Sequence, residues 1–343
     1  MEELLRSGLE TLPLVVLAII AAIALYVLAK GADILVDEAV ALSVKWGIPK
    51  MVIGATIVSL GTTLPEAAVS VGAALQGNPG LALGNAVGSI ICDTALIIGL
   101  ASFIAPLSFD KKATRLQGWL QFSAGLLLVA VSIPWLSLNS IFTRNGNIQQ
   151  YVGFIFVILL IVYIVFSIKN VKNENTPDSL VDEIAEHESG SSVIVLIKMI
   201  TGIALVIVSS KILIPTVEIS AIRVGIPQSI IAATLVAFGT SLPELVTAVT
   251  AARKGHGELA IGNIIGADIL NVLFVVGISA SVTSKGLLVP STFFKFQFPV
   301  MMFALLVFRG STLIAKKAIG RRYGIILFGI YLVYLILSFT WLV

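Results

Sequence analysis

The stretch Gly54–Glu66 reads GATIVSLGTTLPE and Ala232–Glu244 reads AATLVAFGTSLPE, with 8 of 13 positions identical. A second pair of segments, Leu81–Asp93 (LALGNAVGSIICD) and Leu259–Asn271 (LAIGNIIGADILN), is separated by the same 178 residues. This constant offset indicates that the chain contains two copies of one structural unit. Each copy places a carboxylate, hydroxyls and a proline inside very apolar sequence, and in a membrane such a combination marks a functional site.

The composition indicates a membrane protein. Hydrophobic residues make up 57% of the 343 residues and charged residues only 12%, about half the charged share of a soluble domain. The single cysteine, Cys92, excludes an intrachain disulfide and a cysteine-based metal cluster. Because a span needs about 20 apolar residues, we expect an all-α polytopic protein with ten spans, at 12–44, 50–76, 80–105, 115–135, 150–168, 192–222, 227–253, 257–283, 290–308 and 322–342.

The ten spans divide into two five-helix repeats, 1–168 and 192–343, joined by an acidic linker at 169–191. Because five is odd, the second repeat is expected to enter the membrane inverted, as in many secondary transporters with a substrate site near the midplane. Lys and Arg number 14 on the side of the linker and 5 on the other side. The positive-inside rule therefore predicts a cell-membrane protein with both termini outside and the linker in the cytoplasm.

The first motif predicts a cation site in the second span. On a helix, Thr62, Thr63 and Glu66 share one face, and Pro65 cannot donate a hydrogen bond to the preceding turn. We expect a broken helix with unpaired carbonyls from Ser59 onward. Carbonyls, hydroxyls and a carboxylate form an all-oxygen shell that suits hard cations such as Ca²⁺ and Na⁺. The seventh span repeats the arrangement with Thr240, Ser241, Pro243 and Glu244.

The second motif adds residues from the third and eighth spans. Ser89 and Asp93 are four residues apart and share a helix face, and their counterparts in the second copy are Ala267 and Asn271. We expect Asp93 to bind a cation. The extra acid Asp268 is turned about 100° from Ala267 on a helix, so its role stays open. The glycines form two GxxxG pairs typical of close helix packing, Gly84 with Gly88 and Gly262 with Gly266.

The segments GTTLPE, GTSLPE and GNxxG resemble the two α-repeats of the cation/Ca²⁺ exchanger superfamily, and most closely prokaryotic sodium/calcium exchangers, over nearly the whole chain. The resemblance implies a core of spans two, three, seven and eight, with broken helices two and seven, and long gating helices at spans one and six. It further implies an antiporter that exchanges Na⁺ for Ca²⁺ by alternating access. No enzymatic activity, cofactor or nucleic-acid partner is expected, and the oligomeric state stays open.

By match to the family's motifs, Glu66 and Glu244 would be the central Ca²⁺ carboxylates. The other implied ligands would be the carbonyls of Thr62, Thr240, Ser59 and Ala237 and the side chains of Thr63, Ser241 and Ser89. The chain departs from the family's pattern in the second copy, where Ala267 stands in place of a serine. The acid and the amide are also exchanged between Asp93 and Asn271, and Asp268 is unusual. Ion stoichiometry, and ligand roles for Asp268 and Asn271, therefore stay open.

Other functions also fit parts of the sequence. A proton/calcium exchanger would release Ca²⁺ on protonation, but exchangers of that kind usually carry a glutamate soon after the GN pair, which GNAVGS and GNIIGA lack. Dependence on K⁺, or exchange of another divalent cation, fits the same oxygen shell. From another class, Asp93 and Asp268 would be the dyad of an intramembrane aspartyl protease, although neither lies in a GxGD or YD context. A passive channel is disfavoured by the repeated broken helices.

Overall fold

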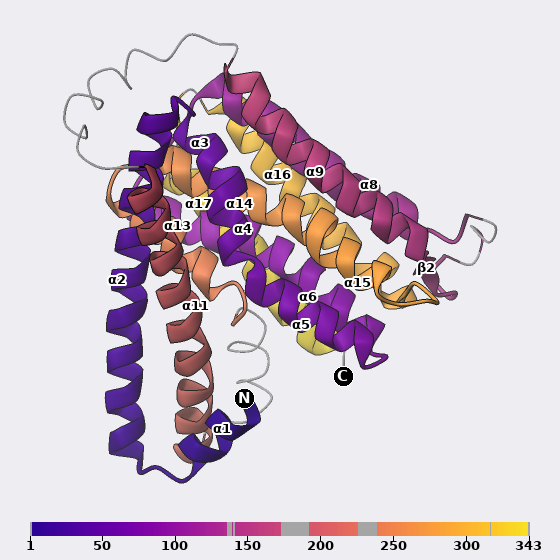
Figure 1. Cartoon of the computed structure of the whole chain (residues 1–343). Helices are drawn as coiled ribbons and strands as arrows, with labels where there is room; N and C mark the ends of the chain where they lie inside the picture. Colours follow the sequence, from indigo (N-terminus) through magenta and orange to yellow (C-terminus); the bar gives the residue numbers. More distant parts are fainter. Residues whose placement is uncertain are drawn as a thin grey trace.

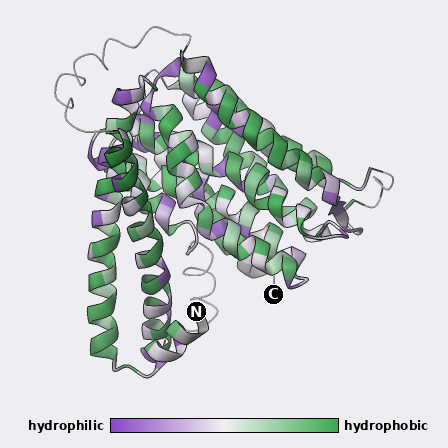
Figure 2. Ribbon diagram, viewed as in Figure 1, coloured by the Kyte–Doolittle hydropathy of each residue, from purple (hydrophilic) through white to green (hydrophobic). Residues whose placement is uncertain are grey.

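The protein is a bundle of helices with one long pair projecting from it. The computed structural model describes residues 2–135, 139, 141–172, 192–225, 239–315 and 317–341. In that part, seven helices are long and apolar enough to cross a membrane, and the bent pair Lys50–Thr62 and Leu64–Leu75 makes an eighth. Figure 2 shows hydrophobic residues along the helices and hydrophilic residues mainly near their ends. The chain is a multi-pass membrane protein.

The helices follow the predicted spans within a few residues at most of their ends. The predicted start of the seventh span and most of the linker lie outside the described residues. With η marking π-helical segments, the first half contains α1 (Glu2–Glu10), α2 (Leu14–Trp46), α3 (Lys50–Ile53), η1 (Gly54–Val58), α4 (Ser59–Thr62), α5 (Leu64–Leu75), α6 (Pro79–Ile91), η2 (Cys92–Ile97), α7 (Ile98–Ile104), α8 (Lys111–Ser132) and α9 (Gln150–Lys172). The second contains α11 (Ser192–Arg223), α13 (Leu242–Arg253), α14 (Gly257–Leu270), η5 (Asn271–Val276), α15 (Gly277–Ser281), η6 (Phe293–Gln297), α16 (Phe298–Ile314) and α17 (Arg321–Trp341).

Local sequence signals set several helix ends. Helix α2 ends at Trp46 because Gly47 adopts the left-handed conformation, with φ 61°, which a glycine tolerates best. Asn78 caps α6 by accepting a hydrogen bond from the Leu81 N–H (3.2 Å). Asp110 caps α8 in the same way, accepting from the Ala113 N–H (2.7 Å). Asn78 therefore marks the end of the connection between spans two and three, and Asp110 marks the end of the connection between spans three and four.

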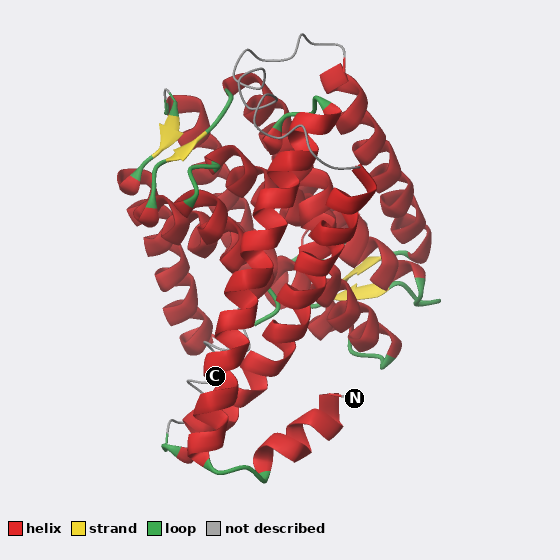
Figure 3. Cartoon of the chain, turned by 60° about the vertical axis from the view of Figure 1, so that its left-hand side comes forward, coloured by secondary structure: helices red, strands yellow, loops and turns green. Residues whose placement is uncertain are grey.

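The projecting pair consists of α2 and α11, which pack side by side (Figures 1 and 3). Their backbones approach closely at two glycines. A methyl group at Gly31 would lie 2.8 Å from Leu205 Cβ, and one at Gly202 would lie 2.9 Å from the Leu35 backbone nitrogen. Small residues at such crossings permit close packing of membrane helices. The pair corresponds to the two long helices expected at spans one and six.

Ion pairs connect this pair to the rest of the chain. The Arg6 Nη2 atom of α1 lies 2.8 Å from Glu218 Oε1 of α11. At the opposite end of α2, Lys254 Nζ lies 2.8 Å from Asp37 Oδ1 and 3.2 Å from Asp33 Oδ1. Because these pairs are partly exposed, each stabilises the fold by about 1 kcal/mol or less.

Two short antiparallel strand pairs join the first half of the chain to the second. Strands β1 (Leu107–Ser108) and β4 (Ala318–Ile319) pair with each other, as do β2 (Gly146–Ile148) and β3 (Leu287–Val289). Figure 3 shows the two pairs on opposite sides of the bundle. The expectation of an all-α protein holds for the long helices. These short strand pairs in the connections were not predicted, because strands of two or three residues are too short to produce an alternating sequence pattern.

Candidate functional site

The break in the second span lies where the first motif predicts it. Helix α4 ends at Thr62, and Thr63 (φ −82°, ψ 0°) separates it from α5, which is bent by 47° relative to Lys50–Thr62. Pro65 lies in the first turn of α5, where its missing N–H costs little. In the second copy, Ser241 (φ −82°, ψ 9°) precedes α13 with nearly the same backbone conformation. The matching sequences therefore make matching turns.

One backbone detail of this break differs from the prediction. The Ser59 carbonyl was expected to be unpaired, but it accepts a hydrogen bond from the Thr63 N–H at 2.9 Å. The helix continues through Thr62, and the missing N–H of Pro65 leaves the Gly61 carbonyl without its usual helical donor. The Ser59 oxygen also accepts from the Thr62 hydroxyl at 3.4 Å, so it is not a free carbonyl. Ala237, its predicted counterpart in the second copy, lies outside the described residues.

Both motif glutamates are buried. Glu66 lies in the first turn of α5 and Glu244 in the first turn of α13, and each exposes only 1% of its surface. The Thr63 hydroxyl donates to Glu244 Oε1 at 3.3 Å. This contact between the two halves shows that the two motifs belong to one site.

The two GN asparagines connect the halves in a reciprocal way. The Thr62 hydroxyl donates to Asn263 Oδ1 (3.4 Å), and the Thr240 hydroxyl donates to Asn85 Oδ1 (3.3 Å). These two contacts are related by the 178-residue offset. Sequence analysis did not assign a role to Asn85 or Asn263, although their presence in both copies was a usable signal. They orient the threonines of the opposite repeat.

Six buried carboxylate oxygens accept no hydrogen bond from any described residue. They are Glu66 Oε1 and Oε2, Asp93 Oδ1 and Oδ2, Glu244 Oε2 and Asp268 Oδ1. The Thr240 hydroxyl lies near Glu66, and the Ser241 hydroxyl lies near Asp93. Because unpaired buried carboxylates are costly, the arrangement calls for cations or protons at these oxygens.

The acids also lie near one another. The charge of Glu66 interacts with those of Glu244 and Asp93, and the charge of Asp93 interacts with those of Glu244 and Asp268. Within the described ranges, no three acidic, histidine or cysteine side chains converge on one point closely enough to hold a metal ion by themselves. A bound cation would therefore need hydroxyl, amide or carbonyl oxygens in addition to carboxylates, as Ca²⁺ and Na⁺ prefer.

Asp268 differs from the other acids because it is anchored. Its Oδ2 atom accepts hydrogen bonds from the Thr94 hydroxyl and from Gln121 Nε2, both at 2.5 Å. Gln121 belongs to α8, outside the four-helix core implied by the sequence. Gln121 was not among the predicted site residues, although a glutamine within an apolar span was an available signal. Asp268 thus lies beside the other acids but keeps only Oδ1 without a described partner.

The remaining predicted ligands are buried around this centre. Ser59 and Thr62 are fully buried on α4, and Ser89 is 2% exposed on α6. Asn271 is 1% exposed, and neither its Nδ2 nor its Oδ1 has a partner among the described residues. Ser241 is likewise buried, with no described partner for its hydroxyl.

Two π-helical segments begin at the GN-motif acid and amide. Asp93 lies at the start of η2 (Cys92–Ile97), and Asn271 starts η5 (Asn271–Val276). A π turn widens the helix locally and often occurs at functional sites. These turns could not be predicted from the amino-acid pattern, because their hydrogen-bond pattern has no separate hydrophobic period.

The second-copy glycines pack tightly, as predicted. A methyl group at Gly262 would lie 2.2 Å from the Met51 carbonyl oxygen, and one at Gly266 would lie 2.5 Å from the Ala55 carbonyl oxygen. For Gly84 the nearest described atom would be 3.9 Å away, and for Gly88 none lies within 4 Å. Close packing through GxxxG is therefore seen for α14 against the second span and not, among the described residues, for α6.

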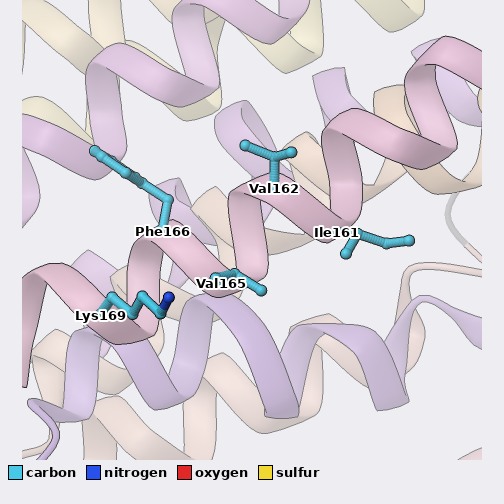
Figure 4. Close-up of a pocket in the computed structure, with 5 residues that line it drawn as sticks. All are labelled: Ile161, Val162, Val165, Phe166 and Lys169. Carbon is cyan, nitrogen blue, oxygen red and sulfur yellow. The ribbon is translucent and has the colours of Figure 1, made fainter.

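A separate groove on α9 is not part of this site. It has a volume of about 440 Å³ and is lined by Ile161, Val162, Val165, Phe166 and Lys169 (Figure 4). The four apolar side chains are between 40% and 58% exposed. The groove belongs to the apolar outer surface of the bundle.

Comparisons with known proteins agree with this geometry. A family model described as "Sodium/calcium exchanger protein" matches residues 16–169 and 194–340. The inner membrane protein YrbG of Escherichia coli is 32% identical over 315 residues, covering 91% of this chain and 93% of that protein. The sodium/calcium exchanger MaX1 of Methanosarcina acetivorans is 29% identical over 336 residues, covering 91% and 95%.

The fold is also similar to a solved exchanger. The sodium-calcium exchanger NCX_Mj, soaked with zero Na⁺ and Ca²⁺, superposes with a TM-score of 0.77 at 26% identity, covering 94% of this chain and 98% of that one. The family model spans most of the chain, and its family consists of transporters, which overturns the protease alternative. The chain therefore belongs to the sodium/calcium exchanger protein family.

Proposed function

We propose that the protein is a secondary-active antiporter that exchanges Na⁺ for Ca²⁺ by alternating access. The observation that carries the proposal is the set of six buried carboxylate oxygens without a described partner, where the two halves meet. Glu66, Glu244 and Asp93 supply the negative charge for Ca²⁺. Thr63, Ser241 and Ser89 supply hydroxyls for Na⁺, with carbonyl oxygens near Ser59, Thr62, Thr240 and Ala237. The names of MaX1 and NCX_Mj support the choice of ions.

Charge repulsion explains why such a site exchanges ions rather than leaking them. Two unit charges 4 Å apart repel by about 4 kcal/mol at an effective dielectric constant of 20. The empty, ionised site therefore resists closure within the protein. One Ca²⁺ or several Na⁺ ions neutralise the carboxylates and permit the carrier to change state. Coupling follows because only loaded forms alternate.

The proposed topology is ten spans in two inverted five-helix repeats. It is supported by contacts that recur at the 178-residue offset, Thr62 with Asn263 and Thr240 with Asn85. Figure 1 shows the two chain ends on the same side of the bundle, as an even number of spans requires. In this scheme α2 and α11 slide against the core formed by spans two, three, seven and eight. The termini face outside, and the 169–191 loop faces the cytoplasm.

Reconstituted flux tests the proposal. In proteoliposomes of the full-length protein, uptake of radioactive Ca²⁺ is expected to require internal Na⁺. Glu66→Gln and Glu244→Gln each remove one carboxylate and are expected to abolish uptake. Glu10→Gln is the matched control, because the Glu10 side chain is 54% exposed and lies far along the chain from the site. Its uptake should equal that of the unaltered protein.

The same assay separates the related functions. Uptake driven by a pH gradient without any Na⁺ would overturn the sodium assignment in favour of a proton/calcium exchanger. An additional requirement for K⁺ on the Na⁺ side would identify a potassium-dependent exchanger. Uptake of another divalent cation with Ca²⁺ excluded would change the substrate but keep the site.

A further inference from the structure

A basic pocket lies between α8 and α16, at the end of the bundle predicted to face the cytoplasm. Its volume is about 380 Å³, and its lining residues are Lys111, Lys112, Arg115, Arg309, Thr312 and Leu313. Four of the six are cationic and none is acidic. The pocket is distinct from the acid-lined ion site, which α8 reaches only farther along, where Gln121 contacts Asp268.

Arg309 is the buried centre of this pocket. It is 3% exposed, and its Nη1 atom lies 3.2 Å from Thr312 Oγ1 and 3.4 Å from the Thr114 carbonyl oxygen. Its Nε and Nη2 atoms have no acceptor among the described residues. The guanidinium also lies 4.8 Å from the Trp119 ring, a favourable cation–π contact. Two unused N–H directions on one guanidinium match the paired oxygens of a phosphate group.

Helix α8 has a glycine where it faces Arg309, which leaves room for the guanidinium. Gly118 of α8 carries no side chain, and a methyl group there would lie 2.8 Å from Arg309 Nη1 and 3.4 Å from its Cδ. Any other residue at this position would displace the guanidinium. The absence of a side chain at Gly118 therefore keeps Arg309 within the pocket.

The rim concentrates positive charge. Lys111, Lys112 and Arg115 are exposed there, and the charge of Arg115 opposes that of Arg309. The nearby acid Asp110 accepts the Ala113 N–H as the N-cap of α8. An anion in the pocket would relieve the repulsion between the arginines.

Apolar side chains adjoin the charged ones. Leu313 is part of the lining, and Trp119, Leu313 and Ile314 are 46%, 49% and 72% exposed. A basic pocket beside an exposed apolar surface matches a molecule with an anionic head and hydrocarbon chains. Basic pockets between transmembrane helices on the cytoplasmic side commonly bind anionic lipid headgroups.

We propose that this pocket binds the phosphate of an anionic phospholipid headgroup. Arg309 would receive two phosphate oxygens, and Arg115, Lys111 and Lys112 would neutralise the remaining charge. The acyl chains would lie along Trp119 and Ile314. The proposal does not depend on which ions the protein transports.

Native mass spectrometry of the full-length protein in detergent tests the proposal, with phosphatidylglycerol and phosphatidylcholine as probes. The unaltered protein is expected to retain phosphatidylglycerol in preference to phosphatidylcholine. The double variant Lys112→Gln/Arg115→Gln alters two exposed side chains and should fold. Because each cation near a membrane surface contributes about a fivefold effect, its affinity for phosphatidylglycerol should fall about 25-fold.

The matched control is Arg253→Gln/Arg322→Gln, which removes two exposed cations from the same predicted side but outside the pocket. It should bind like the unaltered protein. Gly118→Ala keeps every charge and displaces Arg309, so it should weaken binding without changing the net charge. Equal phosphatidylglycerol binding by the pocket variant and the control would overturn the proposal. Displacement of phosphatidylglycerol by millimolar inorganic phosphate would overturn the lipid assignment in favour of a free anion.

Discussion

The two GN motifs occupy equivalent positions but use their asparagines differently. Asn85 donates from Nδ2 to the Glu66 carbonyl (3.2 Å) and to Ser70 Oγ (3.0 Å). The Nδ2 atom of Asn263 has no partner among the described residues. Ala248 occupies the position equivalent to Ser70, so the hydroxyl acceptor is missing. Both copies thus keep the asparagine–threonine contact between the halves, whereas the second copy lacks the asparagine–serine hydrogen bond within its own half.

The acids of the two motifs differ more strongly. Asp93 has two oxygens without a described partner, whereas Asp268 is held by Thr94 and Gln121. One copy supplies a carboxylate available to an ion, and the other supplies an anchored carboxylate beside it. A duplicated scaffold can thus carry unequal carboxylates, and substitutions at these positions can test the inequality.

Removing the free carboxylate of Asp93 should have the largest effect. Asp93→Asn removes a charge that contributes up to ~4 kcal/mol at about 4 Å, so apparent Ca²⁺ affinity should fall by roughly 100- to 1,000-fold. The concentration dependence of Ca²⁺ uptake in proteoliposomes measures this change. The double variant Asp93→Asn/Asn271→Asp restores the carboxylate on the other π-helical segment and should recover affinity to within about tenfold. If the double variant is as weak as the single one, the two positions are not equivalent.

Releasing the anchored carboxylate should have the next largest effect. Gln121→Met removes a hydrogen bond to the Asp268 carboxylate. A charge-assisted hydrogen bond of this kind contributes about 1.5–3 kcal/mol, so Ca²⁺ affinity should fall by about tenfold or more. Gln117→Met is the control, because Gln117 lies one turn away and donates to Ser167 Oγ at 3.1 Å rather than to Asp268.

A double-mutant cycle shows whether Gln121 acts through Asp268. If it does, Gln121→Met should add nothing to the defect of Asp268→Asn. Additive losses in the double variant would mean that Gln121 supports the site by packing instead. The ratio of maximal uptake rate to half-saturating Ca²⁺ concentration for each variant supplies the four values of the cycle.

Restoring the missing hydroxyl should change stability only modestly. Ala248→Ser gives Asn263 Nδ2 an acceptor, and a hydrogen bond of this kind contributes about 0.5–1.5 kcal/mol. The reverse change, Ser70→Ala, removes the acceptor of Asn85 and should destabilise by a similar amount. Thermal unfolding in detergent should move in opposite directions, by about 2–4 °C per kcal/mol. A shift of the same sign for both variants would contradict the comparison.

The smallest effect is expected at the ion pair between Lys254 and α2. Asp37 and Asp33 hold Lys254, whereas the position equivalent to Lys254 in the first copy is Gln76. Lys254→Gln removes a partly exposed contact of about 0.2–1 kcal/mol. Ca²⁺ uptake should change by less than about fivefold, and the change should shrink as ionic strength rises. A larger effect that is insensitive to salt would place Lys254 in the transport mechanism itself.

Much of the site was accessible from local sequence. The proline of the repeated Thr-x-Leu-Pro-Glu segments predicted the break at Thr63, because a proline disrupts the helical turn to which it belongs. The apolar sequence around Glu66 predicted that its side chain is buried. The glycine spacing predicted the close contact at Gly262. The expectation that the Ser59 carbonyl is unpaired was wrong, because the effect of a proline does not extend to the bond between Ser59 and Thr63.

The helical spans, the two copies and the positions of the acids could be derived from the amino-acid sequence, since each follows from composition, apolar length or a repeated motif. Which carboxylate oxygens accept a hydrogen bond depends on the fold. Asp268 and its donor Gln121 are 147 positions apart in the chain, and Thr62 and Asn263 are 201 apart. Whether a buried carboxylate is paired depends on the atoms that packing brings beside it, and no local pattern records those atoms. That pairing separates Asp268 from Asp93 within an otherwise repeated site.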